Sequence, residues 1–98
     1  MQQKGQIIMN NFERMYRLSK EAKENFPPGT RIELISMDDP IHPIPSGTRG
    51  TVDHVDDIGN IHTKWDNGRY LAVIYGEDSF RKLTATELEN EGKAYSVD

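Results

Sequence analysis

Apolar side chains recur at helical spacing in the first quarter of the chain. The stripe advances by three or four residues at each step and consists of Ile8, Phe12, Met15, Ser19, Ala22 and Phe26. This spacing predicts an amphipathic helix over residues 6–25. The helix ends before residues 27–28, both prolines, because proline has no backbone N–H to donate. A large apolar side chain left in water forfeits about 1.5–3 kcal/mol, so we expect Ile8, Phe12 and Met15 to be buried, either on the sheet or in a homodimer.

From residue 30 onward the pattern changes to the alternation that is typical of strands. Residues 30–35 place Ile32 and Leu34 on one face and charged side chains on the other. Residues 69–75 are apolar on both faces, which predicts the most buried strand of the sheet. A last short strand, which contains Phe80, is expected to close the sheet.

A hairpin over residues 51–65 is predicted from the turn residues at positions 56–60, D-D-I-G-N. Symmetric pairing about this turn places Val55 opposite Ile61. Strict alternation would then turn Val52 away from the core. A bulge near Asp53 would return Val52 to the core face and add the twist that a small barrel needs.

A second tight turn follows at Asn67 and Gly68, where a two-residue hairpin turn would give both residues a positive φ. The loop at residues 36–46 contains three prolines, which exclude it from the interior of a sheet. Five short strands joined by one long loop and then by tight turns predict a mainly β fold. We expect a small five-stranded SH3-like antiparallel barrel preceded by an N-terminal α-helix.

The C-terminal segment carries signals for a short helix over residues 85–91. Thr84 and Glu87 have the spacing of a capping box, and Gly92 is placed to end the helix. The predicted organisation is therefore an N-terminal amphipathic helix at 1–26, an SH3-like barrel at 27–83, and a short C-terminal helix with a tail at 84–98.

Composition narrows the class of protein. The 98 residues form one domain, and the absence of cysteine excludes disulfides and thiolate zinc sites. No stretch approaches the length that spans a membrane, so we expect a soluble, cytoplasmic protein. Residues 1–26 carry five basic and three acidic side chains, a net charge of +2, which leaves −6 for the rest of the total of −4. An acidic body repels phosphate backbones, so direct nucleic-acid binding by the barrel is not expected.

Several motifs occur in order along the middle of the chain. They are P-P-G-T-R-I-E-L, D-D-P, P-I-P-x-G-x-x-G-T-V, W-D-N-G-R and D-S-F, spread over roughly residues 27–83. In these motifs the chain resembles a small uncharacterised family, known only as a domain of unknown function, from phages, plasmids and integrative elements of Gram-positive gut bacteria. The resemblance implies a mobile-element origin and no activity, since the family has no catalytic residues to carry over.

Two histidines are expected to face each other across the first hairpin. His54 and His62 would be cross-strand neighbours, and Asp53 or Asp56 would add a carboxylate to a metal site there. Half-exposed histidines on a polar face are commonplace, however, and no metal or other cofactor is predicted. Residues 53–59 lack the second ligand and the closing glutamate of a calcium loop, so their aspartates are interpreted as turn residues.

The proline-containing loop carries the residues that an acid–base enzyme would use. Asp38, Asp39 and His42 lie within five positions of one another. Adjacent carboxylates point in different directions along a chain, and no nucleophile accompanies them. An enzyme that uses this loop is therefore the weaker alternative.

Trp65 has two interpretations. Its position on the core face of its strand favours a buried structural role, while aromatic side chains beside the long loop of SH3-like barrels line grooves for peptides or small ligands. In the second interpretation Arg49 or Arg69 would anchor the ligand and Tyr75 would contribute to the groove. The complete candidate binding face comprises Asp38, Asp39, His42, Pro43, Pro45, Arg49, Trp65, Arg69 and Tyr70.

Taken together, these features favour a non-enzymatic binding module from a phage or mobile element. The expected partner is a host protein, with inhibition of a bacterial defence system as one form of that association. The alternative is sequestration of a small nucleotide-like ligand in an aromatic and arginine-lined pocket. Homodimerisation through the N-terminal helix is a further expectation.

Overall fold

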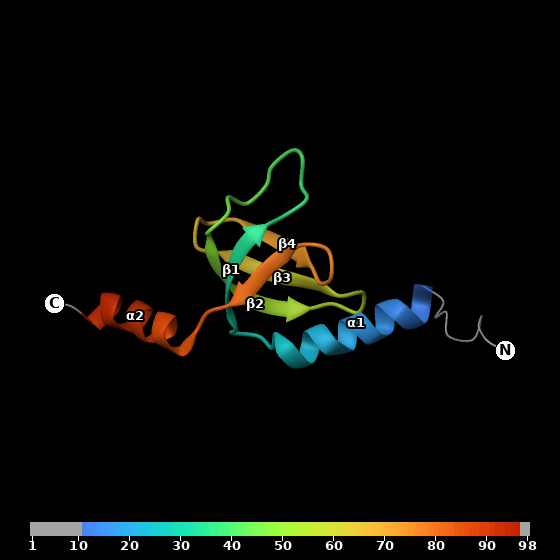
Figure 1. The fold of residues 1–98 in the computed structure, drawn as a ribbon, viewed down its shortest axis with the longest axis horizontal. Coiled ribbons are helices and arrows are strands. Elements are labelled where there is room, and N and C mark those ends of the chain that lie inside the picture. Colours follow the sequence, from blue (N-terminus) through green and yellow to red (C-terminus); the bar gives the residue numbers. More distant parts are fainter. Residues whose placement is uncertain (1–10, 97–98) are drawn as a thin grey trace.

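The structure, a computed structural model, describes residues 11–96, and its side chains are described from residue 11 to residue 92. The described chain is mainly β, as predicted (Figure 1). In chain order its elements are α1 (Asn11–Asn25), β1 (Arg31–Ser36), β2 (Arg49–Val55), β3 (Asn60–Trp65), β4 (Tyr70–Ile74), β5 (Ser79–Lys82) and α2 (Ala85–Ser96). The predicted first helical residues, 6–10, lie outside the described part.

The five strands form one antiparallel sheet in the order β4-β3-β2-β1-β5. The sheet is not closed, because within the described residues β4 and β5 are its two edges, so the predicted SH3-like barrel is not confirmed. Side chains fill the space between these edges. The ring of Phe26 packs edge to face against Tyr75, with centroids 6.1 Å apart, and against Phe80 at 5.2 Å.

The first hairpin has the predicted register. Val55 pairs with Ile61, and the register shifts between Val52 and His54. This shift is the predicted bulge, and Val52 is accordingly buried beside Thr63, its partner on β3.

The second turn has a different geometry from the one predicted. Gly68 has a φ of 91°, but none of the described non-glycine residues has a positive φ, so the prediction for Asn67 is wrong. The backbone N–H of Gly68 donates to the carbonyl of Trp65 at 2.9 Å, and the N–H of Trp65 donates to the carbonyl of Arg69 at 2.8 Å. The loop therefore has three residues, of which only the last is left-handed.

The core lies between the sheet and the second half of α1. Its buried apolar side chains are Ala22, Phe26, Ile32, Leu34, Ile44, Val52, Ile61, Trp65 and Val73. The prediction that residues 69–75 form the most buried strand is wrong. β4 is an edge strand that pairs only with β3, so Val73 faces the core while Tyr70 and Ile74 are exposed.

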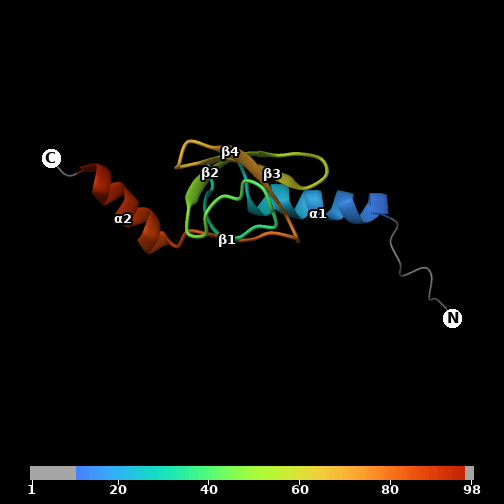
Figure 2. The ribbon, with the colours of Figure 1, turned by 90° about the horizontal axis from the view of Figure 1, so that it is seen from above.

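Only the second half of α1 packs against the sheet. Ser19 and Ala22 are buried, and the hydroxyl of Ser19 donates to the carbonyl of Asp56 at 3.0 Å. The first half extends past the sheet (Figure 2). Phe12 is 78% exposed and Met15 is 39% exposed, so the predicted burial of this part of the stripe on the sheet is wrong. Ile8 lies outside the described residues.

The capping box at the start of α2 is confirmed. The N–H of Glu87 donates to the hydroxyl of Thr84 at 3.1 Å, and the N–H of Thr84 donates to the carboxylate of Glu87 at 2.8 Å. The helix does not end at Gly92 as predicted, because helix-forming residues follow and it continues to residue 96. α1 and α2 extend from opposite ends of the sheet (Figures 1 and 2). Neither of these two described helices combines the length and the apolar character that crossing a membrane requires.

Candidate functional site

The loop at residues 36–46 lies beside Arg69, a residue that was predicted to share a binding face with it. The guanidinium group of Arg69 donates to the carbonyl of His42 at 2.8 Å and to that of Pro43 at 3.2 Å. Ile44, the residue after Pro43, is buried in the core and anchors the loop there, while Pro45 is exposed. The loop is therefore tied to the sheet at several points along its length.

The two carboxylates of this loop differ in their surroundings. Asp39 accepts hydrogen bonds from the N–H groups of Ile41 and His42 at 3.0 and 3.1 Å, and these bonds lower the pKa of its carboxyl. This is the geometry of a turn that an aspartate initiates. Asp38 is exposed, and its backbone N–H donates to the carboxylate of Asp78 at 3.1 Å.

Trp65 is a core residue, and the structural interpretation of it is confirmed. Its side chain is only 3% exposed, and its indole N–H donates to the carbonyl of Leu71 at 2.9 Å. Tyr70 is exposed and donates its hydroxyl to the carboxylate of Asp53 at 2.8 Å. Trp65 therefore offers little surface to a ligand, and Arg49 lies within the ion-pair network described below.

The two histidines of the first hairpin stack on each other. The ring centroids of His54 and His62 are 4.4 Å apart, with an interplanar angle of 10°. Each ring lies 2.9 Å from a different carboxylate, His54 from Asp53 and His62 from Asp56. No group of three metal-binding side chains occurs among the described residues.

Asp56 organises the turn between β2 and β3. Its carboxylate accepts hydrogen bonds from the backbone N–H groups of Ile58 and Asn60 and lies beside His62. Partial burial raises the pKa of this carboxyl, but the hydrogen bonds outweigh burial and lower the pKa to about 2. The interpretation of this aspartate as a turn residue is therefore confirmed.

A group of exposed apolar side chains lies where the first half of α1 passes the end of the sheet. We call it the apolar patch, and it consists of Phe12, Met15, Tyr16, Ile58 and Ile74. The patch borders two adjoining hollows of about 410 and 400 Å³, and Met15 and Ile58 line both. Charged side chains from α1 and the nearby turns surround it, namely Arg14, Lys23, Asp57 and Glu77. The helical stripe in the sequence is the signal for the α1 part of this patch.

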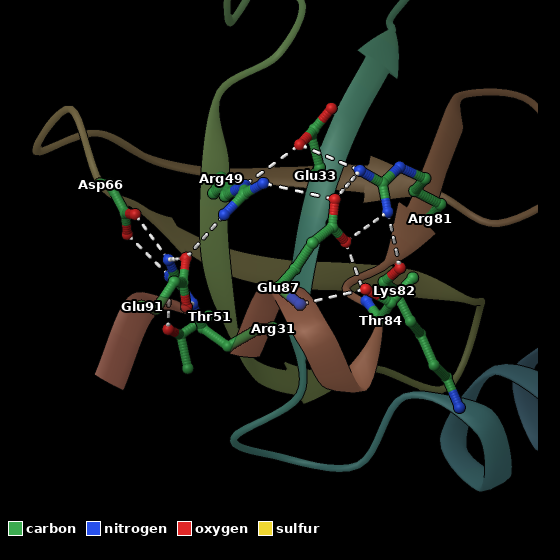
Figure 3. A network of polar contacts seen from close by, with 10 residues as sticks. All are labelled: Arg31, Glu33, Arg49, Thr51, Asp66, Arg81, Lys82, Thr84, Glu87 and Glu91. Carbon is green, nitrogen blue, oxygen red and sulfur yellow. Dashed lines mark hydrogen bonds and ion pairs between the residues drawn. The ribbon is translucent and has the colours of Figure 1, made fainter. Parts of the chain in front are cut away.

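Three arginines project from the outer face of the sheet toward α2 (Figure 3). We call this set the arginine site, and it consists of Arg31 on β1, Arg49 on β2 and Arg81 on β5. The strand register explains why two of them converge, since Arg49 and Arg81 are the cross-strand neighbours of Glu33. The carboxylate of Glu33 lies 3.1 Å from Arg49 and 3.2 Å from Arg81.

Two glutamates of α2 complete the network. Both guanidinium Nη atoms of Arg81 donate to Glu87, at 2.8 and 2.7 Å. Arg31 donates to Glu91 through Nε at 3.0 Å and through Nη2 at 2.6 Å. Arg31 also forms a second two-point contact, with Asp66, at 2.8 and 2.7 Å.

The charges in this network stabilise one another's ionised forms. The hydrogen bonds from Arg81 and from the N–H of Thr84 lower the pKa of Glu87 to about 2. Arg31 likewise lowers the pKa of Glu91 and that of Asp66. In return the pKa of each arginine of the site is raised by its carboxylate partners.

Sequence reasoning missed the arginine site. Arg31 and Glu91 are 60 residues apart, so no local spacing connects them. The available signals were the polar face of β1 and the four-residue interval between Glu87 and Glu91, which places both on one face of a helix.

The fold and its surfaces define a small mainly β domain with one open antiparallel sheet. Residues 16–83 match the family described as Domain of unknown function (DUF4314), and the chain belongs to this family. The match includes the half of α1 that packs on the sheet and ends before α2. No curated protein and no solved structure matches the chain.

Proposed function

We propose that this chain is a non-enzymatic binding module that associates stoichiometrically with another protein through the apolar patch. The observation that carries the proposal is the exposure of Phe12, Met15 and Tyr16 on one half of a helix whose other half is packed. Contiguous exposed apolar side chains with a polar rim are typical of protein–protein interaction sites.

A protein fits this surface better than a small ligand does. Phe12 is one of the most exposed large apolar side chains among the described residues, whereas small-molecule sites enclose most of their ligand. The patch adds Ile58 from a turn and Ile74 from the edge of the sheet, so a partner would contact three separate segments. Aromatic anchors of this kind carry much of the energy of protein interfaces.

The sequence supports a proposal for the nature of the partner. The resemblance carried by the ordered motifs of residues 27–83 implies an origin in a phage or mobile element, and this origin makes a protein of the bacterial host cytoplasm the expected partner. The net charge of −6 over residues 27–98 supports inhibition of a bacterial defence protein, since an acidic surface is suited to occupying a site that otherwise receives nucleic acid.

Neither alternative function gains support from a specific contact. Asp39 directs its carboxylate to two backbone N–H groups of its own turn, which leaves it poorly placed to act as a base. The burial of Trp65 removes the aromatic wall on which the nucleotide-binding alternative depends.

The test uses the full chain with two serines in the patch, Phe12→Ser and Tyr16→Ser. The matched control is Leu88→Ser, which removes an exposed apolar side chain from α2. Each tagged protein is expressed in the host, co-purifying proteins are identified, and the leading candidate is purified and titrated by calorimetry. We expect one-to-one binding by the native chain and by Leu88→Ser, and at least tenfold weaker binding by the double variant, with unchanged circular dichroism.

Equal binding by the double variant would refute the apolar patch as the interface. Loss of binding in an Asp39→Ala/Arg69→Ala variant instead would transfer the site to the loop at residues 38–45. A doubled molecular mass in light scattering that the patch variant abolishes would identify the partner as a second copy of the chain.

A further inference from the structure

The side-chain hydrogen bonds and ion pairs found between α2 and the sheet all involve charged groups. None of the α2 side chains from residue 85 to residue 92 is buried, and the large apolar one, Leu88, is 45% exposed. The ion pairs are those of Glu87 and Glu91. Ion pairs at a surface are individually weak and are screened by salt, so α2 is held less firmly than a helix with a buried apolar face.

The arginine site holds these two glutamates in a defined geometry. Arg81 binds the carboxylate of Glu87 through two nitrogen atoms, and Arg31 binds that of Glu91 in the same way. Arg49 lies between them, 3.4 Å from Glu87 and 3.3 Å from Glu91 (Figure 3). Two-point contacts between guanidinium and carboxylate groups are stronger than single-point contacts, and they depend on direction. The site is therefore matched to two carboxylates one helical turn apart.

Removing α2 would change the charge of this surface. The three arginines face four carboxylates, those of Glu33, Asp66, Glu87 and Glu91, which gives −1. Without the two α2 glutamates the same surface has three arginines and two carboxylates, which gives +1. All three arginines lie within the family domain at residues 16–83, and both glutamates lie beyond it.

We propose that the arginine site recognises an acidic helical segment of a partner protein, one with two glutamates four residues apart, and that α2 occupies the site until such a segment displaces it. An acidic helix is favoured over nucleic acid because the site already holds two carboxylates at this spacing. The negative charge of residues 27–98 also repels an extended phosphate backbone. This site goes beyond the proposed function. The helix that occupies it, α2, extends from the opposite end of the sheet to α1, which carries most of the apolar patch (Figure 2).

α2 weakens the binding of every competing ligand, because it is tethered beside the arginine site at a high effective concentration. Apparent affinity falls with the fraction of molecules in which the site is free. Opening the site by mutation should therefore strengthen the binding of an acidic helical segment.

The experiment uses the full chain with Glu87→Gln and Glu91→Gln. Glutamine at position 87 retains the capping box, so the helix itself is preserved. The probe is a fluorescent peptide with the sequence of residues 83–96, held helical by a side-chain crosslink outside positions 87 and 91, and binding is followed by anisotropy. We expect the variant to bind the peptide at least tenfold more tightly than the native chain, and a peptide with glutamine at both positions to show no saturable binding.

Two controls make the outcome specific. Glu24→Gln/Glu89→Gln removes the same charge from exposed positions for which no ion pair is found among the described residues, and it should bind like the native chain. Adding Arg31→Gln and Arg81→Gln to the opened variant should abolish binding, with folding verified by circular dichroism.

The proposal is overturned if the opened variant binds no more tightly than the native chain. It is also overturned if the glutamine peptide binds equally well. Preferential uptake of a single-stranded oligonucleotide by the opened variant would assign the site to nucleic acid. Because the apolar patch is unchanged in every one of these variants, failure here leaves the test of the proposed function intact.

Discussion

Gly50 on β2 lies opposite Trp65 on β3, and the two residues approach so closely that a side chain at position 50 would require neighbouring atoms to move. A Cβ atom placed on Gly50 would lie 2.8 Å from Cε3 of Trp65. It would lie equally close to the carbonyl oxygen of Lys64 and to a methyl group of Thr63. The glycine therefore provides the space in which the indole ring enters the core.

Gly50→Ala is expected to destabilise the fold by about 1–3 kcal/mol, because backbone and core atoms must move to accept the methyl group. Gly92→Ala provides the opposite case. This glycine lies in an exposed helical position with nothing near its missing Cβ, so alanine should stabilise the protein by up to about 1 kcal/mol. Urea unfolding of both variants measures the two changes, and equal effects would contradict the close approach to Trp65.

The two phenylalanines of the α1 stripe should differ sharply in their contribution to stability. Phe26→Ala is expected to cost about 3 kcal/mol, because its ring fills the space between Tyr75 and Phe80. Phe12→Ala should change stability by less than about 0.5 kcal/mol, since its side chain is exposed. Thermal unfolding separates them, and a large loss for Phe12→Ala would show that the first half of α1 is packed.

The contribution of α2 to stability should depend on pH and salt. Glu87 has its pKa lowered from the usual 4.5 to about 2, so the ionised form is favoured in the folded state. Its contribution is fully present above pH 4.5 and is lost as the pH falls toward 2. The difference in melting temperature between the native chain and Glu87→Gln/Glu91→Gln should therefore be largest near neutral pH and shrink below pH 4.5. At pH 7, 1 M salt should shrink it too, and a difference independent of both variables would exclude an ionic role.

Asp56→Asn should destabilise the turn between β2 and β3 by roughly 1–2 kcal/mol, because the neutral amide accepts more weakly from the two backbone N–H groups and places an NH2 group where Oδ2 accepts from the side-chain amide of Asn60. The neighbouring Asp57→Asn is the control, since its exposed side chain contacts only Lys23 among the described residues. The pKa of Asp56 is lowered from 3.8 to about 2. The stability lost in the variant should therefore have its full size above pH 3.8 and become smaller as the pH falls toward 2. Denaturant midpoints at several pH values measure it.

Arg69→Ala should loosen the loop at residues 38–45 without unfolding the sheet. Its guanidinium group bonds two loop carbonyls, while the buried Ile44 still anchors the loop. We expect faster proteolytic cleavage within the loop and a change in global stability below about 1 kcal/mol. Arg69→Lys retains the charge without the two-point contact and should cleave at an intermediate rate. Unchanged cleavage would show that the loop is rigid without this contact.

The parts of the fold that local sequence determines were predictable. Pairing about one turn gave the contact between Val55 and Ile61, and the side-chain period of two required the bulge that keeps Val52 buried. The capping box of Thr84 and Glu87 needed only a three-residue interval. Each of these features is decided by residues within about ten positions of one another.

The remaining features depend on contacts that no local pattern contains. The apolar stripe of α1 gives no indication that the sheet ends before Phe12, and the apolar run of β4 looks the same at an edge as in the centre. The arginine site joins β1, β2, β5 and α2, so it exists only once strand order is known. The candidate loop was correctly placed beside Arg69, but Trp65 is buried and is not part of an exposed face.

The bulge at Asp53 has a consequence for how the length of this hairpin can vary. Every pair of the ladder, from Gly50 with Trp65 to Val55 with Ile61, leaves Asp53 without a partner. Deleting this residue would therefore keep each remaining pair and each inward-facing side chain in place, whereas deleting Val52 would bring the carboxylate of Asp53 to the core face. A chain one codon shorter at this point would fold with the same partners, and its losses would be the local bend and the carboxylate beside His54 and Tyr70.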